Sequence, residues 1–439
     1  MQQQIKSKVE ELIDLFIKNG EEQTKFIPGK SMVQYAGAIF DHKELLAILE
    51  SLSHGWFGLA EKAHFFEQQF PSLVGCQYGS VVNSGSSANL LALAALKSKN
   101  SPIRLKEGDE VITTACGFPT TINPIIQNQL KPVFVDVDIG SYNANLDSVE
   151  KAISKKTKGI ILAHTLGNSY DMNRLLSIIQ RYNLFFIEDC CDAVGGKYND
   201  NLLGSFGTFS TTSFYPAHHI TLGEGGFVAT NNEVLARIVK SLRDWGRACY
   251  CQGQASLSAK GACGRRFSRW LKDIPEKVDH KYIYGEIGYN LKPLELQCAM
   301  GLIQLTRLPM FIARRKDNFK FYYDMFKEWR EYFYLPVWHT KADPSWFAFP
   351  LTVKPSAPFK RAQIVQWLEE NKIQTRPIFA GNILRHPGYH KINCRVVGGL
   401  PNSDLTCTNS FFIGIYPGIT NQKREYVAEK INIFLKKYK

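Results

Sequence analysis

Four apolar runs separated by stretches of helical spacing are the feature that most constrains how this chain can fold. The runs occupy residues 110–114, 132–136, 159–163 and 184–188. Continuous apolar runs of this length are typical of strands that are buried on both faces of a mainly parallel sheet. Helix candidates alternate with the runs, near residues 86–98, 146–155 and 173–182. The alternation predicts an α/β sheet.

The length of 439 residues and the changes of pattern along the chain predict a large domain with a smaller companion. Apolar residues at helical spacing predict an N-terminal helical segment over residues 1–30. We expect the large α/β domain over residues 31–305 and a small α+β domain over residues 306–439. Residues 246–285 are rich in Cys, Gly, Ser, Lys and Arg, which favours a long functional loop rather than a linker. Two long helices are expected within residues 292–333.

The composition argues against several classes of protein. The formal charge of +13 comes from dispersed basic residues without a known nucleic-acid motif, so we expect no nucleic-acid partner. The polar start lacks the apolar stretch of a signal peptide. The sequence contains no run of about 18 apolar residues, so we expect no membrane-spanning helix. We therefore expect a cytoplasmic protein without a membrane partner. In that compartment, ten cysteines argue for reduced thiols, some of them ligands, rather than for disulfides.

Two segments have residues suited to binding a phosphorylated cofactor. Residues 83–89 form a Gly/Ser-rich turn before an apolar helical run, and such a turn offers backbone N–H groups and hydroxyls to a phosphate. Alone, this pattern indicates only a helix N-cap. Asp189 and Asp192 follow an apolar strand, at the strand end where ligands bind in open α/β sheets. A lone Asp at such a position is more simply a solvated loop residue, so neither segment is decisive by itself.

Residues 213–226 connect these patterns to a known family. They begin with Ser213 and Phe214, continue to His218 and end in Gly-Glu-Gly-Gly. This resembles the cofactor-lysine segment of the sugar aminotransferases, a branch of the fold-type I pyridoxal-phosphate (PLP) enzymes, with His218 at the position of the lysine. The resemblance covers roughly residues 30–435. It implies the fold-type I PLP-dependent transferase fold: a large α/β domain with a mainly parallel seven-stranded sheet, and a smaller C-terminal α+β domain.

The exchange of lysine for His218 has a direct chemical consequence. An imidazole can move a proton, but it cannot form an imine with the cofactor aldehyde. The resemblance therefore implies a cofactor that is bound without a covalent link, as pyridoxamine phosphate (PMP) or PLP, and an enzyme in which His218 is the base. Tyr215 is expected to tune this base. Asp192 stands where many relatives have Gln or His, and we expect it to help retain the amine form of the cofactor.

The resemblance also assigns cofactor contacts to residues in five segments that share the family's order and spacing. The implied contacts are Gly85, Ser86, Ser87 and Ser213 to the phosphate, Phe118 to the face of the ring, Asp189 to the pyridine nitrogen, and Asn290 to the phosphate across the interface of a homodimer. Any one of these residues alone would be weak, since a phenylalanine at a strand end is more often part of the core. Five segments in register make coincidence improbable.

Four of the cysteines have a spacing that suggests a metal centre. Cys191, Cys249, Cys251 and Cys263 give the pattern C-x57-C-x-C-x11-C. This is similar to the 2Fe–2S ligand set of the iron–sulfur 3-dehydrases of the same family, except that the last interval is four residues longer, which puts Cys263 in doubt. A zinc site would use the same residue type, but the usual paired CxxC motifs are absent. Four unrelated buried cysteines are the third alternative, although Cys249 and Cys251 lie among polar residues.

Together, the imidazole and the cysteines imply a PMP- and 2Fe–2S-dependent dehydrase. Such an enzyme removes the 3-hydroxyl of an NDP-4-keto-6-deoxyhexose in 3,6-dideoxyhexose biosynthesis. The resemblance favours CDP-4-dehydro-6-deoxyglucose as substrate and implies a flavin and iron–sulfur reductase as electron donor. The alternatives are an iron-free 3-dehydratase, the same reaction on a dTDP-sugar, and a non-catalytic PLP-binding regulator. Lys292, Arg314 and Arg376 are weaker candidates for binding the nucleotide phosphates, because surface charge explains them equally well.

Overall fold

The computed structural model of the protein describes residues 2–439, except 24, 250–266, 268–270, 272 and 275. Most of the loop expected at residues 246–285 falls in this gap, and Cys251 and Cys263 therefore lie outside the described residues. The remaining candidate site residues are all described.

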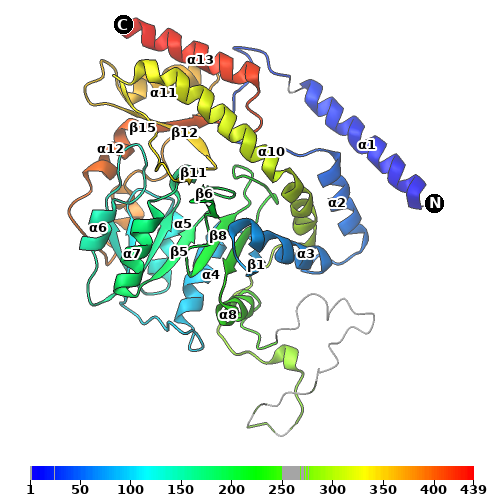
Figure 1. The fold of residues 1–439 in the computed structure, drawn as a ribbon. Coiled ribbons are helices and arrows are strands. Elements are labelled where there is room, and N and C mark those ends of the chain that lie inside the picture. Colours follow the sequence, from blue (N-terminus) through cyan, green and yellow to red (C-terminus); the bar gives the residue numbers. More distant parts are fainter. Residues whose placement is uncertain (1, 24, 250–266, 268–270, 272, 275) are drawn as a thin grey trace.

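An eight-stranded sheet forms the centre of the large domain (Figure 1). Its order is β1 (Tyr78–Val82), β9 (Gly226–Thr230), β8 (Phe209–Ser213), β5 (Phe185–Asp189), β4 (Thr157–Ala163), β2 (Glu110–Thr114), β3 (Lys131–Val135) and β14 (Arg395–Val396). All neighbours from β8 to β14 are parallel, and β9 is antiparallel to both of its neighbours. The mainly parallel sheet was predicted, but with seven strands. The eighth, β14, comes from the C-terminal part of the chain and pairs with β3.

Helices cover both faces of this sheet, as continuous burial of its strands requires. On one face, α4 (Gly85–Lys97) and α8 (Glu233–Arg243) pack on strand residues such as Ile187. On the other, α6 (Leu146–Lys151) and α7 (Met172–Tyr182) pack on residues such as Phe186. Side chains alternate along a strand, so Asp189 points to the α4 face and Glu188 to the α7 face. The helix α5 (Pro119–Gln127) begins beside the α4 face, just after β2.

The two long helices expected over residues 292–333 form one continuous helix, α10 (Glu295–Phe326), with Pro309 inside it. Its first half packs on α2 (His42–Ser53) and α3 (Glu61–Gln69), and the boundary expected at 305–306 falls within it. The sequence predicts no membrane-spanning segment. By length and composition alone, however, α10 is long and apolar enough to cross a membrane. Among the described residues it is the only such helix, and its Phe319, Tyr322 and Phe326 are buried in the C-terminal core.

The C-terminal part combines a second sheet with helices. The sheet has the order β10 (Phe333–Tyr334), β12 (Ala348–Val353), β15 (Ser410–Gly414) and β13 (Thr375–Arg376). The helices are α11 (Arg361–Glu370), α12 (Pro401–Asn409) and α13 (Asn421–Leu435). A small sheet of β11 (Ala342–Asp343), β6 (Lys197–Tyr198) and β7 (Asn201–Leu202) joins this part to the turn after β5. The predicted N-terminal helix is α1 (Gln2–Gln23), which packs beside α2 (Figure 1).

Candidate active site

The turn between β1 and α4 has the form of a phosphate-binding helix N-terminus. Ser84 is the N-cap of α4, and its hydroxyl accepts a hydrogen bond from the Ser87 N–H at 3.1 Å. Gly85 packs so tightly against Ser213 that an added Cβ would lie 2.4 Å from the Ser213 Cβ. Only glycine therefore allows the end of β8 to meet the start of α4. The structure thus brings together Gly85, Ser87 and Ser213, with Ser86 exposed at the same turn.

Asp189 is a buried carboxylate at the end of β5, on the α4 face of the sheet. Its Oδ2 accepts hydrogen bonds from Asn89 Nδ2 at 2.8 Å and from Thr121 Oγ1 at 2.7 Å. Its Oδ1 accepts a bond from the Cys191 N–H at 3.1 Å. These three donors fix the orientation of the carboxylate. Asn89 and Thr121 were not identified from the sequence. The signal was available for Asn89, which is a polar residue within the apolar α4.

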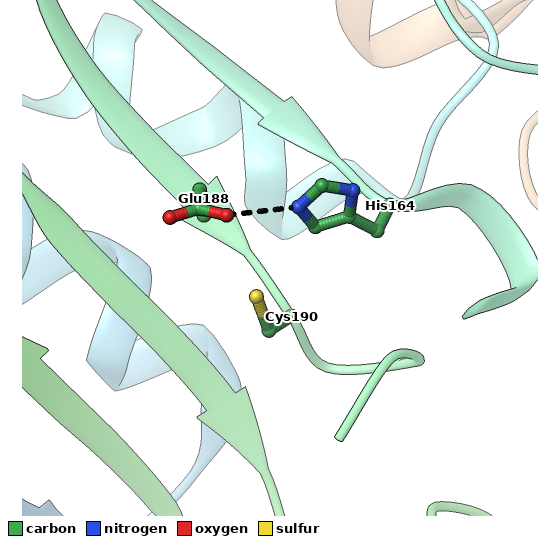
Figure 2. Close-up of side chains that lie close together, drawn as sticks. All are labelled: His164, Glu188 and Cys190. Carbon is green, nitrogen blue, oxygen red and sulfur yellow. Dashed lines mark hydrogen bonds and ion pairs between the residues drawn. The ribbon is translucent and has the colours of Figure 1, made fainter. Parts of the chain in front are cut away.

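Glu188, the preceding residue, is buried on the opposite face and has a different role. Figure 2 shows it with His164 and Cys190, whose ligand atoms lie within 4.8 Å of one another. His164 Nε2 is 3.1 Å from the Glu188 carboxylate. The same carboxylate accepts three backbone N–H bonds from the loop between β7 and β8, at 2.6–2.9 Å. Protein donors occupy both oxygens, so this cluster anchors the end of β5 to that loop.

His218 lies in the loop after β8, beside Asp192. Its Nδ1 is 3.4 Å from Asp192 Oδ1, within ion-pair distance but not aligned for a hydrogen bond. Such contacts are often long without substrate and tighten when it binds. The other oxygen of Asp192 accepts the Leu166 N–H at 3.3 Å. With Nδ1 facing a carboxylate, Nε2 is the nitrogen left to exchange a proton. The structure therefore places two of the predicted catalytic residues together.

Two predicted aromatic residues near the site are exposed. Phe118, at the start of α5, is 52% exposed and contacts Phe379 edge-on at 6.1 Å between ring centroids. It is not a core residue, which was the alternative to a ring-stacking role. Tyr215, three residues before His218, is 48% exposed, and its N–H donates to the Ser213 hydroxyl at 3.3 Å. Both side chains are therefore accessible to a ligand.

Residues 39–432 match the DegT/DnrJ/EryC1/StrS aminotransferase family. The chain belongs to this family. The lipopolysaccharide biosynthesis protein RfbH of Salmonella typhimurium is 43% identical over 431 residues, 98% of each chain. The dTDP-4-dehydro-2,6-dideoxy-D-glucose 3-dehydratase of Saccharopolyspora spinosa is 44% identical over 427 residues, 95% of this chain and 89% of that protein.

A solved structure of a relative has the same architecture. The E. coli GDP-4-keto-6-deoxy-D-mannose-3-dehydratase with bound hydrated PLP superposes with a TM-score of 0.80 at 31% identity, over 91% of this chain and 99% of that chain. The predicted fold, that of the PLP-dependent DegT aminotransferases with a mainly parallel sheet, is therefore confirmed.

The structure describes two of the four cysteines that were predicted to bind an iron–sulfur cluster in this protein. Cys191 is partly buried. The pKa of its thiol is raised well above the ordinary value, mainly by burial and to a smaller extent by the negative charge of Asp189. Cys249 is buried at the end of a segment whose Ala248 N–H donates to the Ile283 carbonyl at 2.8 Å. Cys251 lies outside the described residues, as does Cys263. The iron–sulfur ligand set stays a prediction.

The structure does not bring the three basic substrate candidates together. Lys292 Nζ is 2.5 Å from Asp244 and lies over the Trp245 ring. Arg314 donates at 2.9 Å to the Ile419 carbonyl and so ties α10 to the start of α13. Arg376 is exposed, with its guanidinium over the Tyr35 ring at 4.3 Å. Of the three, the Arg376 side chain is the most accessible.

Asn290 is exposed and lies near the turn between β1 and α4. The carbonyl of its neighbour Leu291 accepts the Asn83 N–H at 2.8 Å, so residues 290–291 lie directly against the turn that opens α4. Asn290 itself forms a bridge with Asp244 in the backbone. These contacts are within one chain, so the prediction that Asn290 reaches the phosphate across a dimer interface stays a prediction.

Sequence reasoning missed Arg315, which lies directly behind His218. Its guanidinium donates to the carbonyls of Phe347 at 2.8 Å and of His218 at 2.9 Å. The signal was present in the spacing, because Arg315 falls between Phe311 and Phe319 on the apolar stripe of α10. A charged residue on such a stripe is buried and must have a structural or functional partner.

Proposed function

We propose that the protein is a PMP-dependent dehydrase that removes the 3-hydroxyl of an NDP-4-keto-6-deoxyhexose. The observation that carries the proposal is the imidazole of His218, held beside Asp192 at the position where aminotransferases of the family have their lysine. A residue that moves protons but cannot bind the cofactor covalently suits deoxygenation better than amino transfer. The names of the 3-dehydratase relatives support this reading.

The described residues fit a bound PMP. Gly85, Ser86, Ser87 and Ser213 would hold its phosphate, since the turn places hydroxyls and free N–H groups at a helix N-terminus. Asp189 would face the pyridine nitrogen, with its carboxylate oriented by Asn89 and Thr121. Phe118 would cover one face of the ring, and Asn290 would reach the phosphate from a second subunit.

When bound, PMP would supply an amine for the sugar ketone and a ring that accepts electrons. His218 would take up a proton at Nε2, and Asp192 would stabilise the resulting imidazolium. Tyr215 would adjust the basicity of His218 from the exposed side of the loop. The same imidazolium can return the proton to the departing 3-hydroxyl, so one residue serves both as base and as acid.

We further propose that Cys191, Cys249, Cys251 and Cys263 bind a 2Fe–2S cluster that a flavin and iron–sulfur reductase reduces. Cys191 lies two residues after Asp189, so a cluster bound there would be near the cofactor ring. Thiolates are the usual ligands of such clusters. The proposed substrate is CDP-4-dehydro-6-deoxyglucose in a cytoplasmic 3,6-dideoxyhexose pathway. A dTDP- or GDP-sugar is the alternative, since relatives are named for both.

A homodimer completes this proposal. Several large apolar residues in the segment that leads to Asn290 are exposed, including Tyr282, Ile287 at 99% exposure and Tyr289. Exposed apolar residues are frequent at subunit interfaces. Light scattering should give twice the chain mass, and Ile287→Glu should shift the protein to the monomer and weaken PMP binding.

The second candidate function is an iron-free 3-dehydratase that forms the 3-deoxy sugar by hydrolysis. The two candidates differ in one measurement, the iron and sulfide content after anaerobic purification. The cluster proposal expects about two irons per chain, lost in Cys191→Ser and kept in the matched variant Cys190→Ser. A colourless, iron-free protein that still consumes the sugar nucleotide would establish the hydrolytic alternative.

The position of the base has its own test. His218→Lys should allow a covalent imine link to PLP, visible as a yellow absorption band that survives dialysis. Absence of the band in a folded variant would mean that His218 is not at the lysine position. Wild-type protein that binds PMP but consumes no sugar nucleotide would instead favour a non-catalytic regulator.

A further inference from the structure

We propose that Arg315 is a positioning residue that holds His218 against Asp192. Its side chain is 1% exposed, and its guanidinium donates to three backbone carbonyls: Phe347 at 2.8 Å, His218 at 2.9 Å and Ala217 at 3.3 Å. Two of these carbonyls belong to the loop that carries the base. The inference rests on the proposed function, because it takes His218 to be that base.

The contacts of Arg315 are part of a closed ring. Arg315 bonds the Phe347 carbonyl, and the Phe347 N–H donates to the Leu166 carbonyl at 2.9 Å. The Leu166 N–H donates to Asp192 Oδ2 at 3.3 Å, and Asp192 Oδ1 lies 3.4 Å from His218 Nδ1. The His218 carbonyl returns to Arg315. The ring therefore sets both the carboxylate and the backbone of the base relative to a single guanidinium.

The turn at residues 165–167 keeps this ring from relaxing. Leu166 has a φ of 55° and Gly167 a φ of 88°, both in the left-handed region. An added Cβ on Gly167 would lie 2.2 Å from the Ser345 carbonyl oxygen and 2.8 Å from that of Asp192. The Ser345 carbonyl is also 2.9 Å from His219 Nε2. The segment leading to Phe347 is thus fixed from two sides. It cannot move to compensate for a displaced guanidinium, so the displacement would change the position of His218.

The ring needs the geometry of arginine as well as its charge. A guanidinium presents several N–H donors in a rigid planar fork, whereas a lysine ammonium is a point charge. Burial lowers the pKa of Arg315 to about 10, and the nearby Asp192 opposes this, so the guanidinium stays charged at neutral pH. Lysine at this position would keep the charge but could not reach all three carbonyls.

The test compares Arg315→Met and Arg315→Lys with the control Arg424→Met. Arg424, on α13, is a largely buried arginine that bonds Asp317 and Asn318 of α10 without contact to the site. Three quantities are measured: kcat with the sugar nucleotide that the wild type consumes, the Kd of PMP, and hydrogen exchange of the peptide covering residues 214–222 in the cofactor-free protein.

We expect Arg315→Met to lower kcat about 100-fold, the effect of displacing a catalytic group by about 1 Å. Arg315→Lys should lower kcat about 10-fold, and both variants should bind PMP within about twofold of the wild type. Exchange at residues 214–222 should be faster in both and unchanged in Arg424→Met. If Arg315→Met does not fold, Gly167→Ala tests the same ring from its opposite side, with the same expected loss of kcat.

Wild-type kcat and wild-type exchange in a folded Arg315→Met would overturn the inference. Equal losses in Arg315→Met and Arg424→Met would also overturn it, because the effect would then be one of general stability. Faster exchange specific to the Arg315 variants, in a protein whose wild type consumes no sugar nucleotide, would support the hold on His218 and refute the proposed function instead.

Discussion

The two halves of the candidate site are built in different ways. The half that we propose binds the cofactor includes Gly85, Asp189 and Ser213, which lie at two strand ends of one sheet and at the start of the helix beside them. Its residues belong to short motifs, and the parallel sheet alone brings them to the same edge. The base half, Asp192, His218 and Arg315, needs α10 and the segment before β12 as well. Local motifs can therefore specify the residues of the proposed cofactor half, while the alignment of the proposed base depends on contacts that are distant in sequence.

This difference predicts that the two halves can be disabled separately. The largest effect is expected for His218→Asn, which keeps a polar side chain but removes the base. Turnover should fall about 1,000-fold, within the range for a lost general base, while the Kd of PMP changes less than about threefold. Steady-state kinetics and a fluorescence titration of PMP measure the two quantities. Parallel loss of PMP binding would show that the halves are not separable.

Asp189→Asn, compared with Glu188→Gln, tests the cofactor half with neighbouring residues on opposite faces of β5. Asp189→Asn removes the charge that we propose faces the pyridine nitrogen, and it should weaken PMP binding and turnover about 30- to 100-fold, about 2–3 kcal/mol. Glu188→Gln leaves His164 and three backbone donors with a poorer acceptor, so it should lower the melting temperature with little effect on PMP. The reverse result would exchange the roles that we give to the two carboxylates.

Gly85→Ala should affect PMP binding more than turnover at saturating PMP. The added methyl would push Ser213 away from the helix start, and we expect the Kd of PMP to rise about 10-fold, the equivalent of about 1.4 kcal/mol. Gly388→Ala is the matched control, because nothing lies within 4 Å of its added methyl. Equal PMP affinities in the two variants would argue that Gly85 and Ser213 do not hold the phosphate.

The smallest effect is expected for Arg395→Met, which touches neither half. Arg395 joins β14 to Glu110 of β2 at 2.7 Å. Burial alone would raise the pKa of Glu110, but the bonds from Arg395 and Ser154 lower it more, leaving it below the ordinary value of 4.5. The stabilisation is therefore complete at neutral pH and is lost as the pH falls below that value.

Denaturant unfolding of the wild type and of Arg395→Met, which gives the free energy of unfolding at each pH, tests this prediction. At pH 7 the variant should be less stable by about 1–2 kcal/mol, with the difference shrinking toward pH 3. Activity of the folded variant should be unchanged. It therefore serves as the control that separates a loss of stability from a loss of activity in the other variants. A difference in stability that grows as the pH falls would show that the ion pair does not lower the pKa of Glu110.

Particular residues show how far the sequence reaches. The apolar runs located β2 and β5 to within one residue, because strands buried on both faces leave little choice of residue type. β14 was not found, since a two-residue strand has no periodicity of its own. Arg315 was not identified, although its spacing from Phe311 and Phe319 places it on the apolar stripe of α10. Its bonds to the Phe347 and His218 carbonyls depend on how α10 packs, which the spacing does not contain.

The sequence by itself predicted the parallel strands at the centre of the sheet, the Gly/Ser turn before α4, the acid at the end of β5 and the imidazole of His218. Each of these depends on neighbouring residues and on the alternation of strands and helices, which a linear pattern contains. Only the tertiary structure decided that Asp192 faces His218 and that Arg315 supports them, because these groups come from elements more than 20 residues apart. Their geometry depends on how the elements pack, and no local pattern encodes that packing.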